Sequence, residues 1–153
     1  MDALAREQGR TLSYARCREL GPKVWSERAR AALLERLDFA PERIPLGAKI
    51  LARTAGNGYV RETVEFASTR HHRIKGELLI PDAGRRPFPA VLALHDHGGF
   101  YTHGREKLVE GLSDSPALME FVEKGYEGRF WASELARRGY VALVTDVLGW
   151  GER

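Results

Sequence analysis

The chain has 153 residues, 43% of them hydrophobic and 29% charged, and its 24 basic and 21 acidic residues leave a net charge of +3. This composition is typical of a globular protein that can bury a core. Because basic and acidic residues are interleaved, the charge pattern does not point to nucleic acid or an anionic membrane as a partner. No apolar run approaches the ~18 residues of a membrane span, and the first residues lack the apolar stretch of a signal peptide. With Cys17 as the only cysteine, no internal disulfide is possible, and we expect a cytoplasmic protein.

Residues 1–58 are expected to form an N-terminal helical arm. Gly21-Pro22 predicts a helix start, because proline is tolerated at the first helical position, where its missing N–H costs no hydrogen bond. Apolar residues then recur at spacings of three and four, which predicts one apolar stripe along the helix, made of Trp25, Ala29, Ala32, Leu33 and Leu37. The segment from Asp38 to Pro45 ends the helix, and a loose stretch leads to a turn at Gly56-Asn57-Gly58.

Residues 59–153 are expected to form a second unit that opens with an antiparallel hairpin. Two strands, 59–66 and 72–80, are joined by the short connection Ser68-Thr69-Arg70, which favours antiparallel pairing. The run from Val91 to Leu94 is apolar without alternation, as is typical of a strand buried on both faces of a parallel sheet.

Helices are predicted between this strand and a second apolar strand at 140–145. Ser115-Pro116 begins a short helix that ends at Gly125, and a firmer helix covers about 128 to 138, with Gly139 after its last residue. Strand, helix and strand in this order make a right-handed βαβ crossover between parallel strands. The predicted fold class is therefore α/β.

The polar residues of interest follow these two apolar strands. The first strand ends in His95-Asp96-His97-Gly98-Gly99, and the second ends in Asp146 with a glycine-rich turn behind it. Glycine at the carboxyl end of a strand lets backbone N–H groups approach a ligand closely, and open α/β sheets bind ligands at that edge.

Taken together, these segments resemble the N-terminal half of the dienelactone hydrolase and acetyl xylan esterase branch of the α/β-hydrolases. The resemblance runs from about residue 59 to the end and is carried by the hairpin, the stretch from Pro89 to Gly99, Trp131-Ala132-x-Glu134-Leu135 and Asp146-x-x-Gly149-x-Gly151-x-Arg153. It implies the N-terminal portion of an α/β-hydrolase fold and serine-type hydrolysis of a carboxylic ester or related acyl bond. A small-molecule ester or acyl compound is the expected partner, and neither a cofactor nor a metal is implied.

The resemblance also implies roles for the strand-end residues. The loop would supply half of an anion hole, through the backbone N–H of His97 in one register or that of Gly98 or Gly99 in the other. We favour His97, because His95 directly ends the apolar run. His95 is then structural, with its ring pinning the loop. The remaining residues expected to shape or line the pocket are Asp96, Phe100, Tyr101, His103, Asp146, Trp150 and Arg153.

The rest of the catalytic machinery implied by the resemblance is not found in the sequence. A Ser or Cys nucleophile, an acid and a catalytic histidine would all lie beyond residue 153. Ser113 does not fit the nucleophile, since it follows no strand and no glycine stands two places after it. We therefore expect a partial sequence that is inactive alone. Its apolar strand from Val91 would be left as an unpaired edge, which favours aggregation.

Other hypotheses remain open at this stage. The chain is alternatively a non-catalytic remnant of the fold or a subunit that needs a partner. A metal-dependent hydrolase is a further alternative, because His95-x-His97 with Asp96 and His103 offers nitrogen and oxygen ligands. The zinc hydrolases that it suggests usually continue with further Asp and His ligands, where this chain has glycine and Phe100.

Ordinary structural interpretations also stand beside the functional ones. His95 is alternatively a strand-end histidine whose tip reaches solvent, and Asp146 a turn aspartate that bonds its own backbone. The pair Gly149-x-Gly151 resembles a dinucleotide loop, but the third glycine and the downstream acidic residue of such loops are not present.

Overall fold

The computed structural model describes residues 9–37 and 42–153, and the chain divides into two compact units, Met1–Glu42 and Arg43–Arg153. The expectations for the first residues of the chain and for the start of the helix-ending segment at Asp38 fall outside the described residues. No helix within the described ranges is long and apolar enough to cross a membrane.

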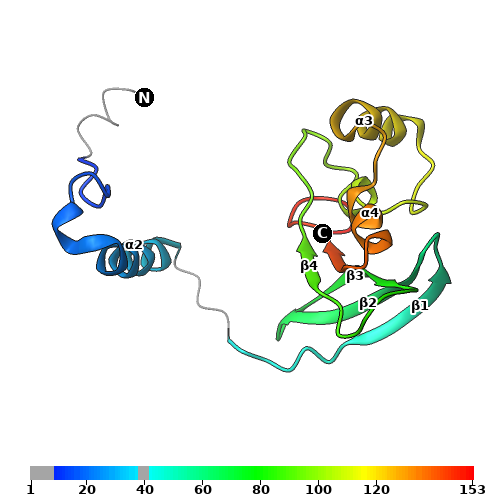
Figure 1. Cartoon of the computed structure of the whole chain (residues 1–153), viewed down its shortest axis with the longest axis horizontal. Helices are drawn as coiled ribbons and strands as arrows, with labels where there is room; N and C mark the ends of the chain where they lie inside the picture. Colours follow the sequence, from blue (N-terminus) through cyan, green and yellow to red (C-terminus); the bar gives the residue numbers. More distant parts are fainter. Residues whose placement is uncertain (1–8, 38–41) are drawn as a thin grey trace. The chain divides into compact units, whose positions relative to one another are not determined.

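The first unit is built on the helix α2 (Gly21–Leu37), preceded by the 3-10 turn η1 (Arg18–Leu20) (Figure 1). The helix starts at Gly21, as predicted. Trp25 anchors it locally, since its indole N–H donates to the carbonyl of Leu12 at 2.8 Å. None of residues 21–37 is buried, and Leu33 and Leu37 are 57% and 59% exposed. The predicted apolar stripe is therefore not buried against the described residues of this unit.

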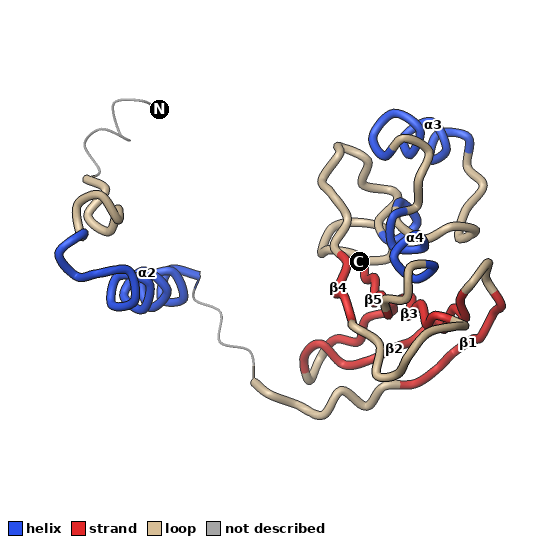
Figure 2. Tube along the Cα trace, in the orientation of Figure 1, coloured by secondary structure: helices blue, strands red, loops and turns tan. Residues whose placement is uncertain are grey.

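The second unit contains a mixed sheet, in which the described residues form strands in the order β1-β2-β3-β5-β4 (Figure 2). These strands are β1 (Lys49–Ala55), β2 (Tyr59–Thr69), β3 (His72–Pro81), β4 (Ala90–Ala93) and β5 (Val141–Thr145). The hairpin of β2 and β3 is antiparallel, and β4 pairs with β5 in parallel. Both pairings were predicted from the sequence.

Strand β1 corrects the expectation of a loose stretch before the turn at residues 56–58. It pairs antiparallel with β2, from Lys49 opposite Glu65 to Ala55 opposite Val60. Every residue of β1 is exposed, so the strand has no buried face and its sequence carries no apolar alternation to mark it. It lies before residue 58, where we placed the end of the arm, whereas the compact unit begins at Arg43.

The helices of this unit are the 3-10 turn η2 (Arg105–Lys107), α3 (Pro116–Tyr126) and α4 (Trp131–Arg137). Helix α4 is shorter than predicted, because Gly128 takes a positive φ of 71° that belongs to the turn after α3. Gly139 has φ 91° after α4, as expected of a residue that ends a helix. The core between α4 and the sheet is made of Tyr59, Leu79, Ala93, Leu108, Val109, Ala132, Ala136, Ala142 and Val144.

Strand β4 does not have the burial that its apolar sequence predicted. It stands at the end of the sheet order, next to β5 only. Ala93 is 1% exposed, but Leu92 and Leu94 are 64% and 60% exposed. Burial on both faces requires cover on each side of the sheet, and the residues that the structure describes cover only the side that carries Ala93.

Candidate functional site

His95 joins the two strand ends that carry the predicted site. The residue is 7% exposed, and its ring lies between the loop after β4 and the turn after β5. The Nε2 atom accepts the backbone N–H of Val147 at 3.0 Å, so the ring proton is on Nδ1, which donates to the carbonyl of Asp96 at 2.9 Å. The hypothesis that the tip of His95 reaches solvent is therefore wrong.

The three candidate donors of the anion hole have different surroundings. The N–H of Gly99 donates to Nδ1 of His97 at 3.1 Å, and Nε2 of that ring donates to the hydroxyl of Tyr101, also at 3.1 Å. The N–H groups of His97 and Gly98 have no acceptor among residues 9–37 and 42–153. Two adjacent peptide groups therefore offer unpaired donors.

Gly98 occupies a position where a larger residue would be strained. Its φ is +51°, and a Cβ atom there would lie 2.5 Å from the ring of Phe121 and 2.6 Å from the carboxylate of Asp96. The loop thus passes so close to α3 that the Phe121 ring packs directly against the backbone carrying one of the free donors.

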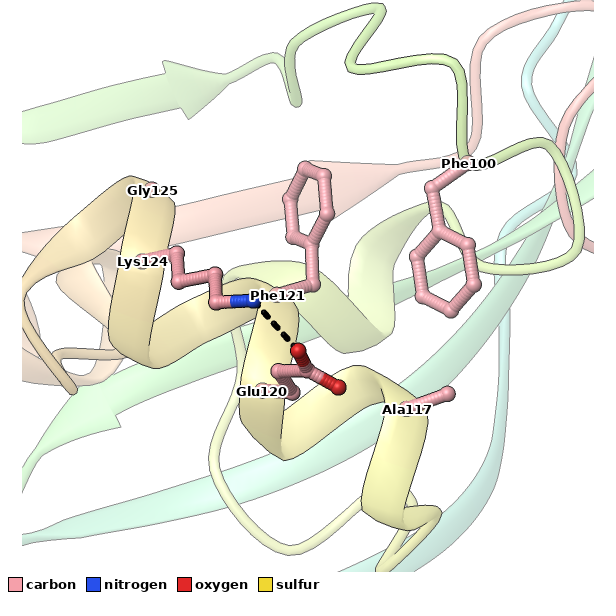
Figure 3. A pocket seen from close by; sticks show the side chains of 6 residues that line it. All are labelled: Phe100, Ala117, Glu120, Phe121, Lys124 and Gly125. Atoms are coloured by element: carbon pink, nitrogen blue, oxygen red, sulfur yellow. Dashed lines mark hydrogen bonds and ion pairs between the residues drawn. The ribbon is translucent and has the colours of Figure 1, made fainter.

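A pocket of about 360 Å³ lies on the α3 side of this loop (Figure 3). Phe100 and Phe121 form its aromatic wall, with ring centroids 5.3 Å apart, and His103 stacks on Phe100 at 4.6 Å. The ion pair of Lys124 and Glu120 forms a polar edge. Because Phe121 also touches Gly98, the pocket and the free amides share a wall.

A second aromatic group holds the loop on the other strand end. The ring of Trp150 lies 4.9 Å from that of Tyr101 and 5.2 Å from that of His97, centroid to centroid. Its indole N–H donates to the carbonyl of His97 at 3.3 Å. Trp150 and Tyr101 therefore pack against the loop and each other.

Asp146 is buried, at 1% exposure, and receives donors from several segments. Its carboxylate accepts the backbone N–H of Arg105 at 2.7 Å, the guanidinium of the same residue at 2.5 Å and the N–H of Glu152 at 3.2 Å. Arg153 donates to its carbonyl at 2.9 Å. Asp146 is thus more than a turn residue, because its main partner comes from η2.

Beneath Asp146 lies a charged cluster that sequence reasoning missed. Arg105 also reaches Glu77, with Nε 3.5 Å from Oε1, and Glu77 is 2% exposed and bonded to Thr63 at 3.0 Å. Burial raises the pKa of the Glu77 carboxyl in spite of these partners. Arg105, Lys107 and Glu77 stand in polar stretches, and nothing in their spacing distinguishes them from solvent-exposed charges.

The histidines of the metal hypothesis are not gathered into one group of ligands. No group of three His, Cys, Asp or Glu side chains suited to a metal ion exists in the described part of the chain. The ring of His95 is occupied by backbone partners, and His103 lies against Phe100, with Nδ1 2.9 Å from the hydroxyl of Thr102.

Comparison with known proteins bears on the fold. No protein-family model matches the sequence. The chain is 29% identical over 124 residues to "Putative hydrolase YtaP" of Bacillus subtilis (strain 168), a match that covers 81% of this chain and 38% of that protein.

Solved structures with a similar fold include two esterases. A "putative acetyl xylan esterase" from Bacteroides fragilis NCTC 9343 superposes with a TM-score of 0.59 at 23% identity, covering 85% of this chain and 31% of that one. A glucuronoyl esterase from Solibacter usitatus has a TM-score of 0.48 at 17% identity, covering 86% and 41%. The first of these confirms the predicted α/β-hydrolase-type fold at partial coverage, and this chain spans about 38% of the curated relative's length.

Proposed function

We propose that this chain supplies the anion-hole loop of an α/β-hydrolase-type esterase that acts on a small carboxylic ester or related acyl compound. The observation that carries the proposal is the pair of unpaired N–H groups of His97 and Gly98 on a loop held from both strand ends. The names of the similar proteins, a hydrolase and an acetyl xylan esterase, support the same reaction class.

The chemistry follows from where charge develops during acyl transfer. Attack on an ester carbonyl carbon moves negative charge onto the carbonyl oxygen, and preorganised donors stabilise that charge by roughly 3–4 kcal/mol each. Backbone N–H groups suit this task because their direction is set by the fold and needs no rearrangement during the reaction. His97 and Gly98 are the donors in this proposal, and Gly99 serves instead to hold the His97 ring.

The proposal assigns the nucleophile, its acid and its catalytic histidine to residues outside this sequence. The 153 residues contain no Gly-x-Ser-x-Gly segment. The pocket beside Phe100 and Phe121 is then suited to an apolar group of the substrate, because it adjoins the free amides and has two aromatic rings on its wall.

The test compares two substitutions at His97 in the protein expressed from its complete gene. His97→Pro deletes the proposed donor, whereas His97→Ala removes the same ring and keeps the N–H. We expect kcat for p-nitrophenyl acetate to be at least about 100-fold lower in His97→Pro than in His97→Ala. KM should agree within about twofold, since the lost bond acts in the transition state.

Equal turnover of the two variants would remove His97 from the anion hole. Circular dichroism establishes that both variants are folded. A wild-type protein that hydrolyses no acyl substrate would overturn the proposed function and favour the non-catalytic alternative.

A further inference from the structure

Lys107 is fully buried, at 0% exposure, and pairs with the carboxylate of Asp96. The nearest carboxylate oxygen, Oδ1 of Asp96, is 3.7 Å from its Nζ. The ammonium group also lies near two backbone carbonyl oxygens, 3.4 Å from that of Asp96 and 3.5 Å from that of His97. The rings of Phe121 and Phe100 lie on its other side, with centroids at 5.0 and 5.9 Å. A buried cation is costly unless its partners compensate, and here the two loop carbonyls contribute to that compensation beside the carboxylate of Asp96.

These two carbonyls belong to the peptide groups that carry the free donors. The carbonyl of one residue and the N–H of the next form one planar unit, and in a trans peptide they point in opposite directions. The Asp96 carbonyl and the His97 N–H thus belong to one peptide group, and the His97 carbonyl and the Gly98 N–H belong to the next. Lys107 lies at the carbonyl ends of both units, while the N–H ends have no acceptor in the described part of the chain.

Each of the two carbonyls also accepts a neutral donor. Nδ1–H of His95 donates to the Asp96 carbonyl at 2.9 Å, and the indole N–H of Trp150 to the His97 carbonyl at 3.3 Å. Hydrogen bonds in a chain polarise one another, so a donor at the carbonyl end makes the N–H end a better donor. A charged donor does this more strongly than a neutral one. The ammonium thus both orients and polarises the two units.

We propose that Lys107 is a positioning residue of the anion hole, whose ammonium group holds and polarises the peptide groups of Asp96–His97 and His97–Gly98. The link to an oxyanion rests on the proposed function, but the electrostatic coupling between Lys107 and the two peptide groups does not. The coupling is therefore tested separately from catalysis.

The first test follows the two peptide groups by NMR while Lys107 loses its proton. Carbonyl-13C aspartate with 15N histidine labels one peptide bond in these 153 residues, Asp96–His97. Carbonyl-13C histidine with 15N glycine labels two, His97–Gly98 and His103–Gly104, and the second is an internal reference. Carbon-detected carbonyl–nitrogen spectra need no amide proton and remain usable at alkaline pH.

Both labelled peptide groups should shift with one common midpoint below the ordinary lysine pKa of 10.5, because burial lowers the pKa of Lys107. The Lys107→Met variant should lose this titration, and the exposed control Lys49→Met should keep it. The charged or titratable groups facing Lys107 and the loop are His95, Asp96, His97, Tyr101, Glu106 and Tyr126. Tyr101→Phe removes the phenol that contacts His97, and burial raises the pKa of Tyr126.

A wild-type titration that is absent, or that persists unchanged in Lys107→Met, would overturn the proposal. If Lys107→Met does not fold, the test is whether both labelled peptide groups shift with one common midpoint in the wild type and in Tyr101→Phe. Absence of that common midpoint in either protein would then overturn the proposal. In the catalytic arm, Lys107→Met should lower kcat for p-nitrophenyl acetate about 10-fold with KM within about twofold. A wild type without esterase turnover overturns the proposed function and leaves the NMR result to decide the role of Lys107.

Discussion

At the scale of single residues, the loop after β4 contains two adjacent glycines in different surroundings. Gly98 and Gly99 both have left-handed backbone, with φ values of +51° and +64°. A Cβ atom at Gly98 would meet Phe121 and Asp96, whereas a Cβ atom at Gly99 would meet nothing within 4 Å. Substitution of Gly99 therefore tests the free-energy cost of the backbone conformation alone, whereas substitution of Gly98 adds the cost of a steric clash.

Gly99→Ala should destabilise the protein by about 1–2 kcal/mol, which is the cost of placing a Cβ in left-handed backbone. Gly98→Ala should cost at least about 1 kcal/mol more, because the Phe121 ring must also move. Urea unfolding of both variants measures the difference. Equal losses of stability would mean that the loop moves away from α3 without cost, and would contradict the tight contact at Gly98.

At the scale of elements, buried charges tie β3, η2 and the turn after β5 together. Arg105 bonds to Asp146 and lies near Glu77, so η2 is held against the sheet by ionic contacts as well as by the apolar side chains of Leu108 and Val109. Such contacts are directional and fix where η2 lies, although burying the charges is costly. Because Lys107 follows in the same turn, this cluster also positions the ammonium behind the loop.

The Glu77 carboxyl makes the stability of the folded protein depend on pH, and the direction of its pKa shift gives the sign. Its pKa is raised above the ordinary value of 4.5 by burial, so the folded protein holds this proton more tightly than the unfolded chain. Its contribution to stability is complete below pH 4.5 and is lost as the pH rises towards the folded pKa. Glu77→Gln should therefore gain stability relative to wild type as the pH rises through that interval.

Glu65→Gln is the matched control for this measurement. The hydrogen bond from Arg73 lowers the pKa of Glu65, so its contribution is present above pH 4.5 and lost as the pH falls below that value. Relative to wild type, Glu65→Gln should lose stability as the pH rises, opposite in sign to Glu77→Gln. Urea unfolding across this pH range checks both signs, and the same sign for both variants would contradict the opposite pKa directions.

At the scale of the whole molecule, the two edges of the sheet differ in their protection. Strand β1 carries the charged residues Lys49 and Arg53 and a register shift between Ile50 and Ala52. Charges and bulges of this kind hinder pairing with another chain. Strand β4 reads Ala-Val-Leu-Ala, without a charge, and its Leu92 is 64% exposed. The β4 edge is thus the surface open to association.

Purified by itself, the 153-residue chain should self-associate through β4. Leu92→Lys should reduce this association, because a charged side chain disfavours both edge pairing and the burial of that face. Leu51→Lys, on the already charged β1 edge, should have little effect. Size-exclusion chromatography with light scattering measures the outcome, and a monomeric wild-type chain would contradict the prediction.

The sequence alone predicted the elements whose signals are local. The hairpin of β2 and β3, the parallel pair of β4 and β5, and the position of the loop at His95 to Gly99 follow from short connections, apolar runs and strand-end glycines. Strand β1 escaped prediction because its residues have no buried face, and β4 was expected to be buried because an apolar run does not say what covers it.

Only the tertiary structure decided which backbone N–H groups at the site are free to bind a ligand. The ring of His97 takes the N–H of Gly99, and Lys107 and Arg105 lie buried behind the loop although they stand in a polar stretch. The physical reason is that periodicity reports which face of an element is apolar, whereas burial of a charge or occupation of a donor depends on partners brought from distant parts of the chain. Composition and spacing therefore determined the α/β fold and the place of the site, and packing decided its donors.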